Sequence, residues 1–200
     1  MKIRLATATI LTTVGLAQTV AAQDAGEWIV RSGFHSMEPK SGNHALVEVA
    51  NQISLTFNAT YMFAANWGVE LFAALPFTHG LTFDGSGEVA EMDLLPRTLS
   101  AQYHFNPHGR VRPYVGAGLN YTSFSDERTW GALQGAKLEL DPSFGPAAQL
   151  GVDLDVIPGW FINVDARWFD IDTDGKLSGA DLGTVEIDPF AFGVSIGHRF

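Results

Sequence analysis

Apolar and polar residues alternate with a period of two along much of the chain. The segment 51–64 shows this best, with mainly polar residues at the even positions and apolar residues at Ile53, Leu55, Phe57, Ala59, Tyr61 and Phe63. The same alternation is present in 67–77 and in 145–157. Successive side chains of a β-strand point to opposite faces, so the period predicts strands that separate two different environments.

The pattern predicts eight strands, at 27–36, 51–64, 67–78, 94–105, 112–124, 143–157, 160–171 and 185–200. Three connectors are short, at 65–66, 106–111 and 158–159, and four are long, at 37–50, 79–93, 125–142 and 172–184. Short and long connectors alternate strictly, which is typical of outer-membrane barrels with short periplasmic turns and long extracellular loops. We therefore predict an all-β fold, an eight-stranded antiparallel up-and-down transmembrane β-barrel.

The first residues predict export. Lys2 and Arg4 precede a short apolar run at 5–16, and Val20 and Ala22 stand at the −3 and −1 positions of a signal-peptidase site. A membrane-spanning helix needs about 20 predominantly apolar residues, and this run is shorter and contains threonines. We expect residues 1–22 to be a cleaved signal peptide and 23–200 to be the barrel.

A soluble lipocalin-like barrel would also have eight strands, with its apolar face turned inward. The apolar face of this chain carries aromatic residues near the strand ends, as expected where a barrel wall crosses two lipid interfaces. One row comprises Trp28, Tyr61, Phe63, Trp67, Tyr103, Phe105 and Trp160, and the other comprises Phe34, Phe77, Tyr121 and Trp168. This distribution favours a membrane barrel.

The C-terminus supports the same location. Every second residue back from Phe200 is apolar as far as Phe190, except His198. This arrangement resembles the C-terminal signal of bacterial outer-membrane barrels, which the barrel-assembly machinery recognises. We therefore expect the protein in the bacterial outer membrane, in contact with its lipid and lipopolysaccharide, and recognised by that machinery through Phe200.

Composition removes some alternatives. The net charge is −10 and there are no basic clusters, which argues against nucleic acid as a partner. There are no cysteines, so a small exported domain needs another source of stability than disulfides. A closed barrel supplies it, because every backbone N–H and C=O group is paired around the ring.

Several blocks of sequence resemble the outer membrane protein W (OmpW) family. They are AGEWIVR at 25–31, TYM at 60–62, GVELFAALPF at 68–77, RPYVGAGLNYT at 112–122, QLGVD at 149–153 and DIDT at 170–173. The resemblance covers nearly the whole predicted mature chain. It implies a narrow, partly hydrophobic conduit for uptake of small hydrophobic molecules. Arg167 departs from the pattern, because an aromatic residue is expected at that lumen-facing position.

Strand parity assigns the lumen. The half near the periplasm is expected to receive a charge cluster, Arg31, Glu70, Asp153, Asp165 and Arg167, along with Phe72 and Phe161, whose rings also contribute to the apolar lumen above. Isolated buried charges are costly, so these should pair, either as a structural plug or as a gate that rearranges. Apolar lumen residues are expected above the cluster, namely Phe72, Phe161, Phe169, Tyr114, Phe124 and Leu94. These could line a conduit or simply fill a thin barrel.

Other functions are less well supported by the residues. His35, His44 and His79 are expected near loops, with serines at 36, 41 and 86, but no motif links them into a catalytic set. The spacing of 170–181 resembles a calcium loop, although strands rather than helices flank it and no Glu ends it. We expect no enzyme, cofactor or metal. A structural barrel, or a docking surface formed by the loops, stays open.

Overall fold

The computed structural model describes residues 24–39, 47–49, 52–83 and 88–200. Nearly all of them are in β-strands: β1 (Trp28–Glu38), β2 (Val47–Val49), β3 (Gln52–Ala64), β4 (Trp67–Ala74), β5 (Phe77–Phe83), β6 (Glu88–His104), β7 (Val111–Thr129), β8 (Leu138–Leu140), β9 (Ser143–Ile157), β10 (Trp160–Phe169), β11 (Asp172–Leu177), β12 (Ala180–Glu186) and β13 (Phe190–Arg199). One 3₁₀ turn, Gly131–Leu133, follows β7. Among these residues no helix is long and apolar enough to cross a membrane.

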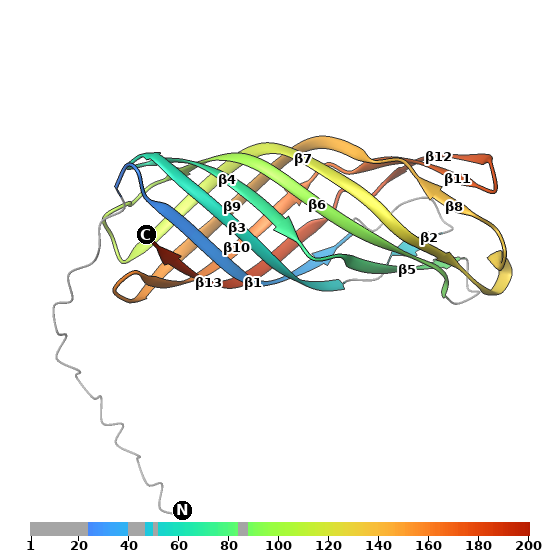
Figure 1. The fold of residues 1–200 in the computed structure, drawn as a ribbon, viewed down its shortest axis with the longest axis horizontal. Helices are drawn as coiled ribbons and strands as arrows, with labels where there is room; N and C mark the ends of the chain where they lie inside the picture. The colour runs from blue at the N-terminus through green and yellow to red at the C-terminus, as the bar shows by residue number, and fades with distance from the viewer. Residues whose placement is uncertain (1–23, 40–46, 50–51, 84–87) are drawn as a thin grey trace, which may run out of the picture.

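Eight antiparallel strands close into a barrel in the order β1, β3, β4, β6, β7, β9, β10, β13 and back to β1 (Figure 1). The predicted fold class is confirmed. The tight turns at 65–66, 105–110 and 158–159 all lie at one end, which also holds the C-terminus. We call this the turn end and the opposite one the hairpin end. Closure leaves the barrel without a free strand edge, so its backbone polar groups are paired.

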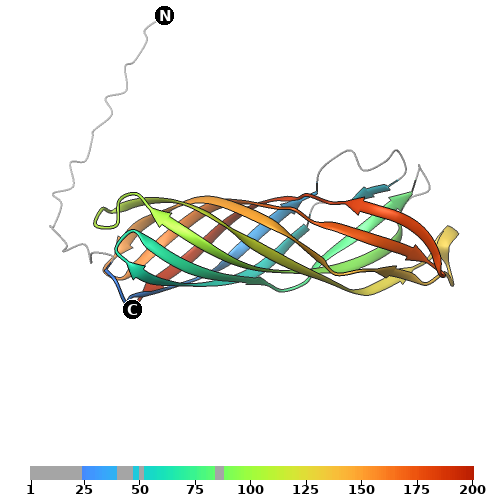
Figure 2. The same ribbon diagram turned by 90° about the horizontal axis from the view of Figure 1, so that it is seen from above.

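The hairpin end extends further than the predicted long loops suggested (Figure 2). Much of 79–93, 125–142 and 172–184 is strand: β5 pairs with β6, and β11 pairs with β12 and β8. The alternating pattern marks where a strand faces lipid on one side. It does not mark where backbone pairing ends, because an antiparallel hairpin can continue in water.

Short interruptions separate the lower barrel from this extension. Leu75 and Pro76 lie between β4 and β5, and the chain is also irregular between β10 and β11 and between β12 and β13. The break at Pro76 changes the parity of the strand. Phe77 was predicted to face outward and is instead buried, opposite Leu94. The prediction was wrong there because proline removes a ladder donor and ends regular alternation.

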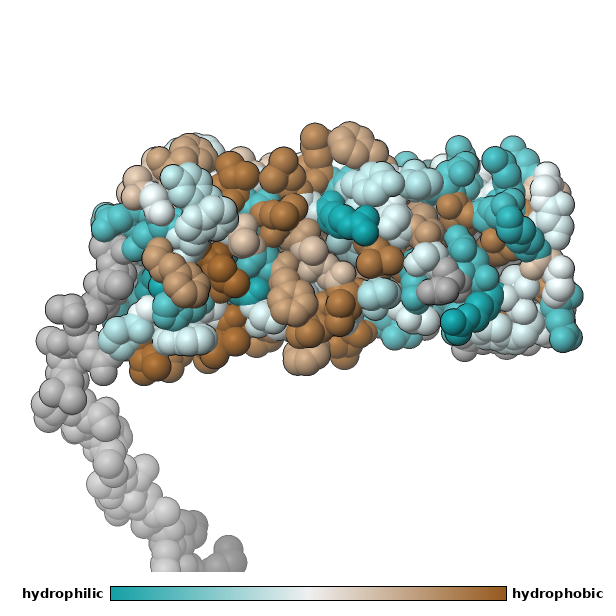
Figure 3. All heavy atoms as spheres, viewed as in Figure 1, coloured by the Kyte–Doolittle hydropathy of each residue, from teal (hydrophilic) through white to brown (hydrophobic). Residues whose placement is uncertain are grey.

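The barrel is apolar outside and polar inside along its lower part. Exposed side chains on the wall include Phe57, Leu71, Leu99, Leu150 and Val194, whereas charged and amide side chains are buried within. Figure 3 shows the apolar side chains gathered over the wall strands, with hydrophilic residues prevailing over the extension. Most of the predicted aromatic residues lie outward, for example Trp28, Trp67 and Phe34.

Candidate functional site

The lumen of the barrel contains three layers. Near the hairpin end lies an apolar layer, formed by Met37, Phe72, Phe77, Met92, Leu94, Ala147, Phe169, Ile171, Ile187 and Ala191, with Phe124 packed against it. In the middle lies a charge layer, formed by Arg31, His35, Glu70, Asp153, Asp165 and Arg167. At the turn end lies a third layer, formed by Ile29, Met62, Arg112, Asp155, Phe161 and Arg199.

Arg31 joins opposite sides of the barrel in the charge layer. It comes from β1 and binds Asp153 of β9 with two parallel hydrogen bonds, Nε to Oδ1 at 3.2 Å and Nη2 to Oδ2 at 2.8 Å. Its third nitrogen, Nη1, donates to the Thr60 hydroxyl at 3.1 Å. Such two-pronged contacts between guanidinium and carboxylate are among the stronger hydrogen bonds in proteins. The pair therefore braces the barrel across its lumen.

Glu70 accepts hydrogen bonds from three other strands. Its carboxylate lies 2.8 Å from Nη1 of Arg167, 2.8 Å from Nε2 of Gln102 and 3.1 Å from Nε2 of Gln149. Nη1 of Arg31 is 3.6 Å away and adds a second cation. Both carboxylate oxygens are thus satisfied although the side chain is fully buried, which is the condition under which a buried charge is tolerated.

Asp165 connects Arg167 to a histidine. Nε of Arg167 lies 2.6 Å from Oδ2 of Asp165, and Nε2 of His35 lies 3.1 Å from Oδ1. His35 was expected near a loop, and this expectation was wrong: it is buried on the lumen face of β1. The parity of β1 could have found it, because His35 is four residues from Arg31 and shares its face.

The apolar layer rests directly on these charges. The guanidinium of Arg167 lies 4.2 Å from the centroid of the Phe72 ring, a cation–π distance. Phe72 also contacts Phe169 at 6.1 Å and the His35 ring at 5.5 Å between centroids. Leu94 is completely buried and Phe124 is partly buried. Arg167, which departs from the pattern of the OmpW family, therefore lies at the boundary between the apolar layer and the charge layer.

Tyr114 lies elsewhere along the axis than expected. It was predicted above the charge cluster, whereas it comes near the start of β7, close to the turn end; Phe161, predicted both beside and above the cluster, lies near the start of β10. The guanidinium of Arg31 lies 5.2 Å from the Tyr114 ring centroid and 5.4 Å from that of Phe161. Strand parity predicts which face of the wall a residue occupies. The position of the residue along the barrel axis depends instead on where its strand begins.

The turn-end layer was not anticipated from the sequence. Arg112 binds Asp155 through both terminal nitrogens, with Nη1 at 2.7 Å from Oδ2, and Nη2 of Arg199 lies 2.9 Å from Oδ1. The Phe161 ring lies beside both arginines. Strand parity could have revealed both arginines, because Arg112 shares the inward face of β7 with Tyr114 and Arg199 shares that of β13 with Gly197. This layer closes the lower lumen with a second set of paired charges.

A small cavity lies among these layers. It has a volume of about 10 Å³ and lies between β6, β9 and β10, lined by Thr98, Ser100, Ala147, Ala148, Gln149, Arg167 and Phe169. That is about the space of one water molecule. Around this cavity the side chains of β6, β9 and β10 are therefore tightly packed.

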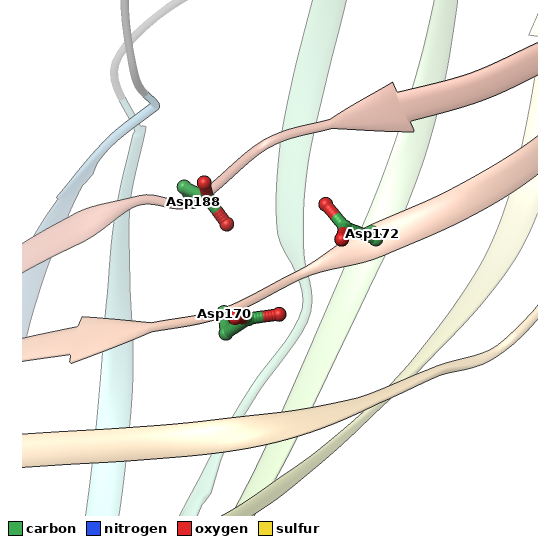
Figure 4. Close-up of side chains that lie close together, drawn as sticks. All are labelled: Asp170, Asp172 and Asp188. Atoms are coloured by element: carbon green, nitrogen blue, oxygen red, sulfur yellow. The ribbon is translucent and has the colours of Figure 1, made fainter.

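The calcium-like segment does not form a calcium loop. Residues 172–186 are a β-hairpin, in which Asp174 accepts from the Thr184 hydroxyl and Asp181 from the Gly183 amide. Asp170 and Asp172 instead lie near Asp188, with one carboxylate oxygen of each within 4.8 Å of the others (Figure 4). Exposed acidic groups commonly lie together without a metal; here Asp172 is exposed, and Asp170 and Asp188 are partly buried.

The other candidate catalytic residues form no set in the described structure. His79 is buried in β5 and stacks against Phe77, and Ser36 lies in β1. His44, Ser41 and Ser86 lie outside the described residues, as does the expected signal peptide.

Comparison with known proteins shows the family to which this chain belongs. The OmpW family model matches residues 12–200. The chain belongs to the OmpW family. It is 37% identical to outer membrane protein W of Escherichia coli (strain K12) over 210 residues, covering 98% of this chain and 99% of that protein.

The crystal structure of the outer membrane protein OprG from Pseudomonas aeruginosa is also similar, with a TM-score of 0.81 and 30% identity, covering 90% of this chain and 99% of that one. A further relative, the dibenzothiophene metabolism operon protein PahQ of Pseudomonas aeruginosa, is 29% identical, covering 76% of this chain and 74% of that protein. The OmpW-family protein described here is thus an outer-membrane β-barrel, surrounded by outer-membrane lipid. The relatives in Escherichia coli and Vibrio cholerae are named as outer membrane proteins rather than as enzymes.

Proposed function

We propose that this OmpW-family barrel is a narrow conduit for uptake of small hydrophobic molecules across the outer membrane. The observation that carries the proposal is the apolar layer at the hairpin end, which rests on a closed charge layer. Outer-membrane barrels place their longer connections outside the cell, so the apolar layer faces the environment. A lumen filled only for stability would not need its apolar residues gathered toward that side.

The name of one relative supports an apolar cargo. PahQ is named for an operon of dibenzothiophene metabolism, and dibenzothiophene is a flat aromatic molecule with no charge. The rings of Phe72, Phe77 and Phe169 offer such a molecule apolar and aromatic surface. Water solvates an apolar solute poorly, so the transfer of the solute from water to contact with aromatic side chains would be favourable.

The charge layer would then decide where the cargo leaves. Arg31, Glu70 and Arg167 close the straight path toward the turn end. Cargo must wait for the ion pairs to rearrange or leave sideways through the wall. Pro96, Pro113 and Pro146 each lack a ladder donor, and all three lie on strands β6, β7 and β9, opposite Thr122, Val152 and Leu119. We propose that the backbone pairing of the wall is weakest between these strands, and that cargo leaving sideways passes there.

An uptake measurement tests the conduit. Phe72→Asp and Phe169→Ser put polar groups into the apolar layer, and Phe72→Leu is the matched control that keeps it apolar. Uptake of dibenzothiophene into liposomes should fall several-fold in the two polar variants and change little in the control. A polar solute of similar size should show no such dependence.

Unchanged dibenzothiophene uptake in correctly folded Phe72→Asp and Phe169→Ser barrels would contradict the conduit. It would favour a structural barrel, or a docking surface at the hairpin end. We propose no enzymatic activity and no cofactor, because the relatives in Escherichia coli and Vibrio cholerae are named as outer membrane proteins rather than as enzymes. An esterase or acyltransferase activity of the purified barrel would contradict that.

The remaining proposed partners are lipopolysaccharide and the barrel-assembly machinery. Phe200 is 72% exposed at the turn end, where its backbone pairs with that of Trp28. The closing strand β13 thus presents its terminal aromatic ring outward. An accessible terminal phenylalanine is what recognition by an assembly factor would need.

A further inference from the structure

The outer wall of the barrel carries an apolar groove across β3, β4 and β6. It has a volume of about 360 Å³ and is lined by Trp28, Ala59, Tyr61, Val69, Leu71 and Leu99. In the strand register Ala59 lies opposite Leu71, and Leu71 lies opposite Leu99. The small side chain of Ala59 lies among larger neighbours, which hollows the wall there. All six residues are apolar or aromatic, so the groove suits a hydrocarbon chain.

A cation lies immediately above this groove. Arg97 is two residues from Leu99 on the same outward face of β6, opposite Ala73 on one side and Tyr121 on the other. Its guanidinium is exposed and donates through Nη1 to the Ser123 hydroxyl at 3.3 Å. It forms no ion pair with any carboxylate in the described part of the chain. Most of its donors are therefore available to an anion from outside the protein.

Arg97 is exceptional on this wall. Between the two aromatic rows, no other Lys, Arg, Asp or Glu occupies an outward position of the eight wall strands, as far as they are described. A cation facing hydrocarbon is costly unless it reaches a polar partner at the interface. The long side chain of arginine can extend toward such a partner while its stem stays in an apolar environment.

The height of Arg97 puts that partner in the outer leaflet. Arg97 is eight residues before Phe105, which directly follows the last residue of β6, at the turn end. At about 3.3 Å per residue and a tilt of about 40°, this is roughly 20 Å along the barrel axis, near the far edge of an apolar band about 25 Å tall. The turn end faces the periplasm by the rule for such barrels, so the guanidinium reaches the extracellular headgroup region.

We propose that this face is a binding site for a phosphorylated lipid of the outer leaflet, the lipid A part of lipopolysaccharide. A lipid A phosphate binds the Arg97 guanidinium, beside the hydroxyl group of Tyr121, and one acyl chain lies in the groove below. Arginine is well suited to phosphate, because its planar fork of donors matches the phosphate oxygens.

The charge distribution decides between the two leaflets. The lower end of the groove is formed by Trp28 and Tyr61, whose rings lie 5.2 Å apart. Strands β1, β3 and β4 present no outward lysine or arginine there, within their described residues. The phosphate group of a bound lipid can therefore pair with a cation at the upper end of the groove, where Arg97 lies. A leaflet is about 15 Å thick in its hydrocarbon part, so a chain anchored at Arg97 can follow the groove downward.

Lipid retention measured by native mass spectrometry tests the site on the full barrel in detergent. The probes are bisphosphorylated lipid A, its dephosphorylated form and phosphatidylethanolamine. Arg97→Gln should weaken binding of bisphosphorylated lipid A about tenfold, and Arg97→Lys should weaken it less. Ala59→Phe fills the groove and should weaken both forms of lipid A. Arg128→Gln is the control, because Arg128 is exposed, lies at the hairpin end and pairs with Glu91.

Heat-dependent mobility on gels shows that each variant is folded. Equal binding of bisphosphorylated lipid A by the wild type and by Arg97→Gln would overturn the proposal. So would equal binding of the two forms of lipid A by the wild type. Tighter retention of phosphatidylethanolamine, dependent on Ala59 but not on Arg97, would assign the groove to an inner-leaflet lipid and likewise contradict the proposal. None of these results depends on solute uptake through the lumen.

Discussion

His35 donates a hydrogen bond to Asp165 inside the barrel, with its Nε2 atom 3.1 Å from Oδ1 and 3.2 Å from Oδ2 of the carboxylate. The other ring nitrogen, Nδ1, lies 2.7 Å from the hydroxyl oxygen of Thr56. The Thr56 hydroxyl also lies 3.2 Å from the carbonyl oxygen of Gly33. The ring of His35 therefore links Thr56 of β3 to Asp165 of β10 across the lumen.

His35 is thus part of the charge layer, beside Arg31, Arg167, Glu70, Asp153 and Asp165. His35→Leu should cost roughly 1–3 kcal/mol in unfolding free energy, because it leaves one side of Asp165 without a donor. Unfolding titrations that show no loss of stability for folded His35→Leu would contradict this role.

Arg167→Ala should open the charge layer. The variant removes the hydrogen bonds to Glu70 and Asp165 and leaves two buried carboxylates with fewer partners. Breaking a buried pair from one side costs roughly 3–5 kcal/mol, so stability should fall and small-ion conductance in planar bilayers should rise. Arg128→Ala, which breaks an exposed pair with Glu91, should change stability by at most about 1 kcal/mol. Unaltered conductance of folded Arg167→Ala would show that this ion pair does not close the lumen.

Leu71→Arg should reveal the lipid-facing wall. Leu71 is 57% exposed in the middle of β4 and Val111 is 50% exposed at the start of β7, near the turn end. An outward arginine costs about 2–4 kcal/mol at mid-membrane and about 0–1 kcal/mol near an interface. Unfolding titrations in lipid vesicles should therefore show a large loss for Leu71→Arg and a small one for Val111→Arg. Equal effects would contradict the assigned depth.

Phe200→Ser should separate assembly from stability. The backbone hydrogen bonds between residue 200 and Trp28 do not need the phenyl ring, which is exposed. We expect the variant to refold into detergent as well as the wild type and to reach the outer membrane of cells in several-fold lower amount. The readout is heat-modifiable barrel in membrane fractions. Normal amounts in cells would exclude Phe200 as the recognition signal.

Single cysteines test the orientation, since the natural chain has none. Lys137 is exposed at the hairpin end and His108 is exposed in the turn between β6 and β7. An impermeant thiol reagent on intact cells should label Lys137→Cys strongly and His108→Cys at least about tenfold less, because the outer membrane shields the periplasm. The reverse pattern would invert the barrel.

The sequence by itself determined the local features of this protein. The period of two in 51–64 and 145–157 fixed which side chains face lipid, because a pleated strand offers only two faces. Alternating connector lengths predicted the antiparallel barrel and its closure. The same parity put Arg31, Glu70 and Arg167 on the inner face, and the cost of burying charge predicted that they would pair.

Only the tertiary structure decided which groups meet. Arg31 pairs with Asp153, 122 residues away, and Arg167 with Glu70, 97 residues away, because strand stagger sets the height of each inward side chain. Stagger also placed Tyr114 beside Arg31, and the break at Pro76 turned Phe77 inward. Register likewise brought Ala59 opposite Leu71 and Leu71 opposite Leu99, which formed the groove below Arg97. Alternation specifies a face, whereas register between strands distant in sequence specifies the neighbours.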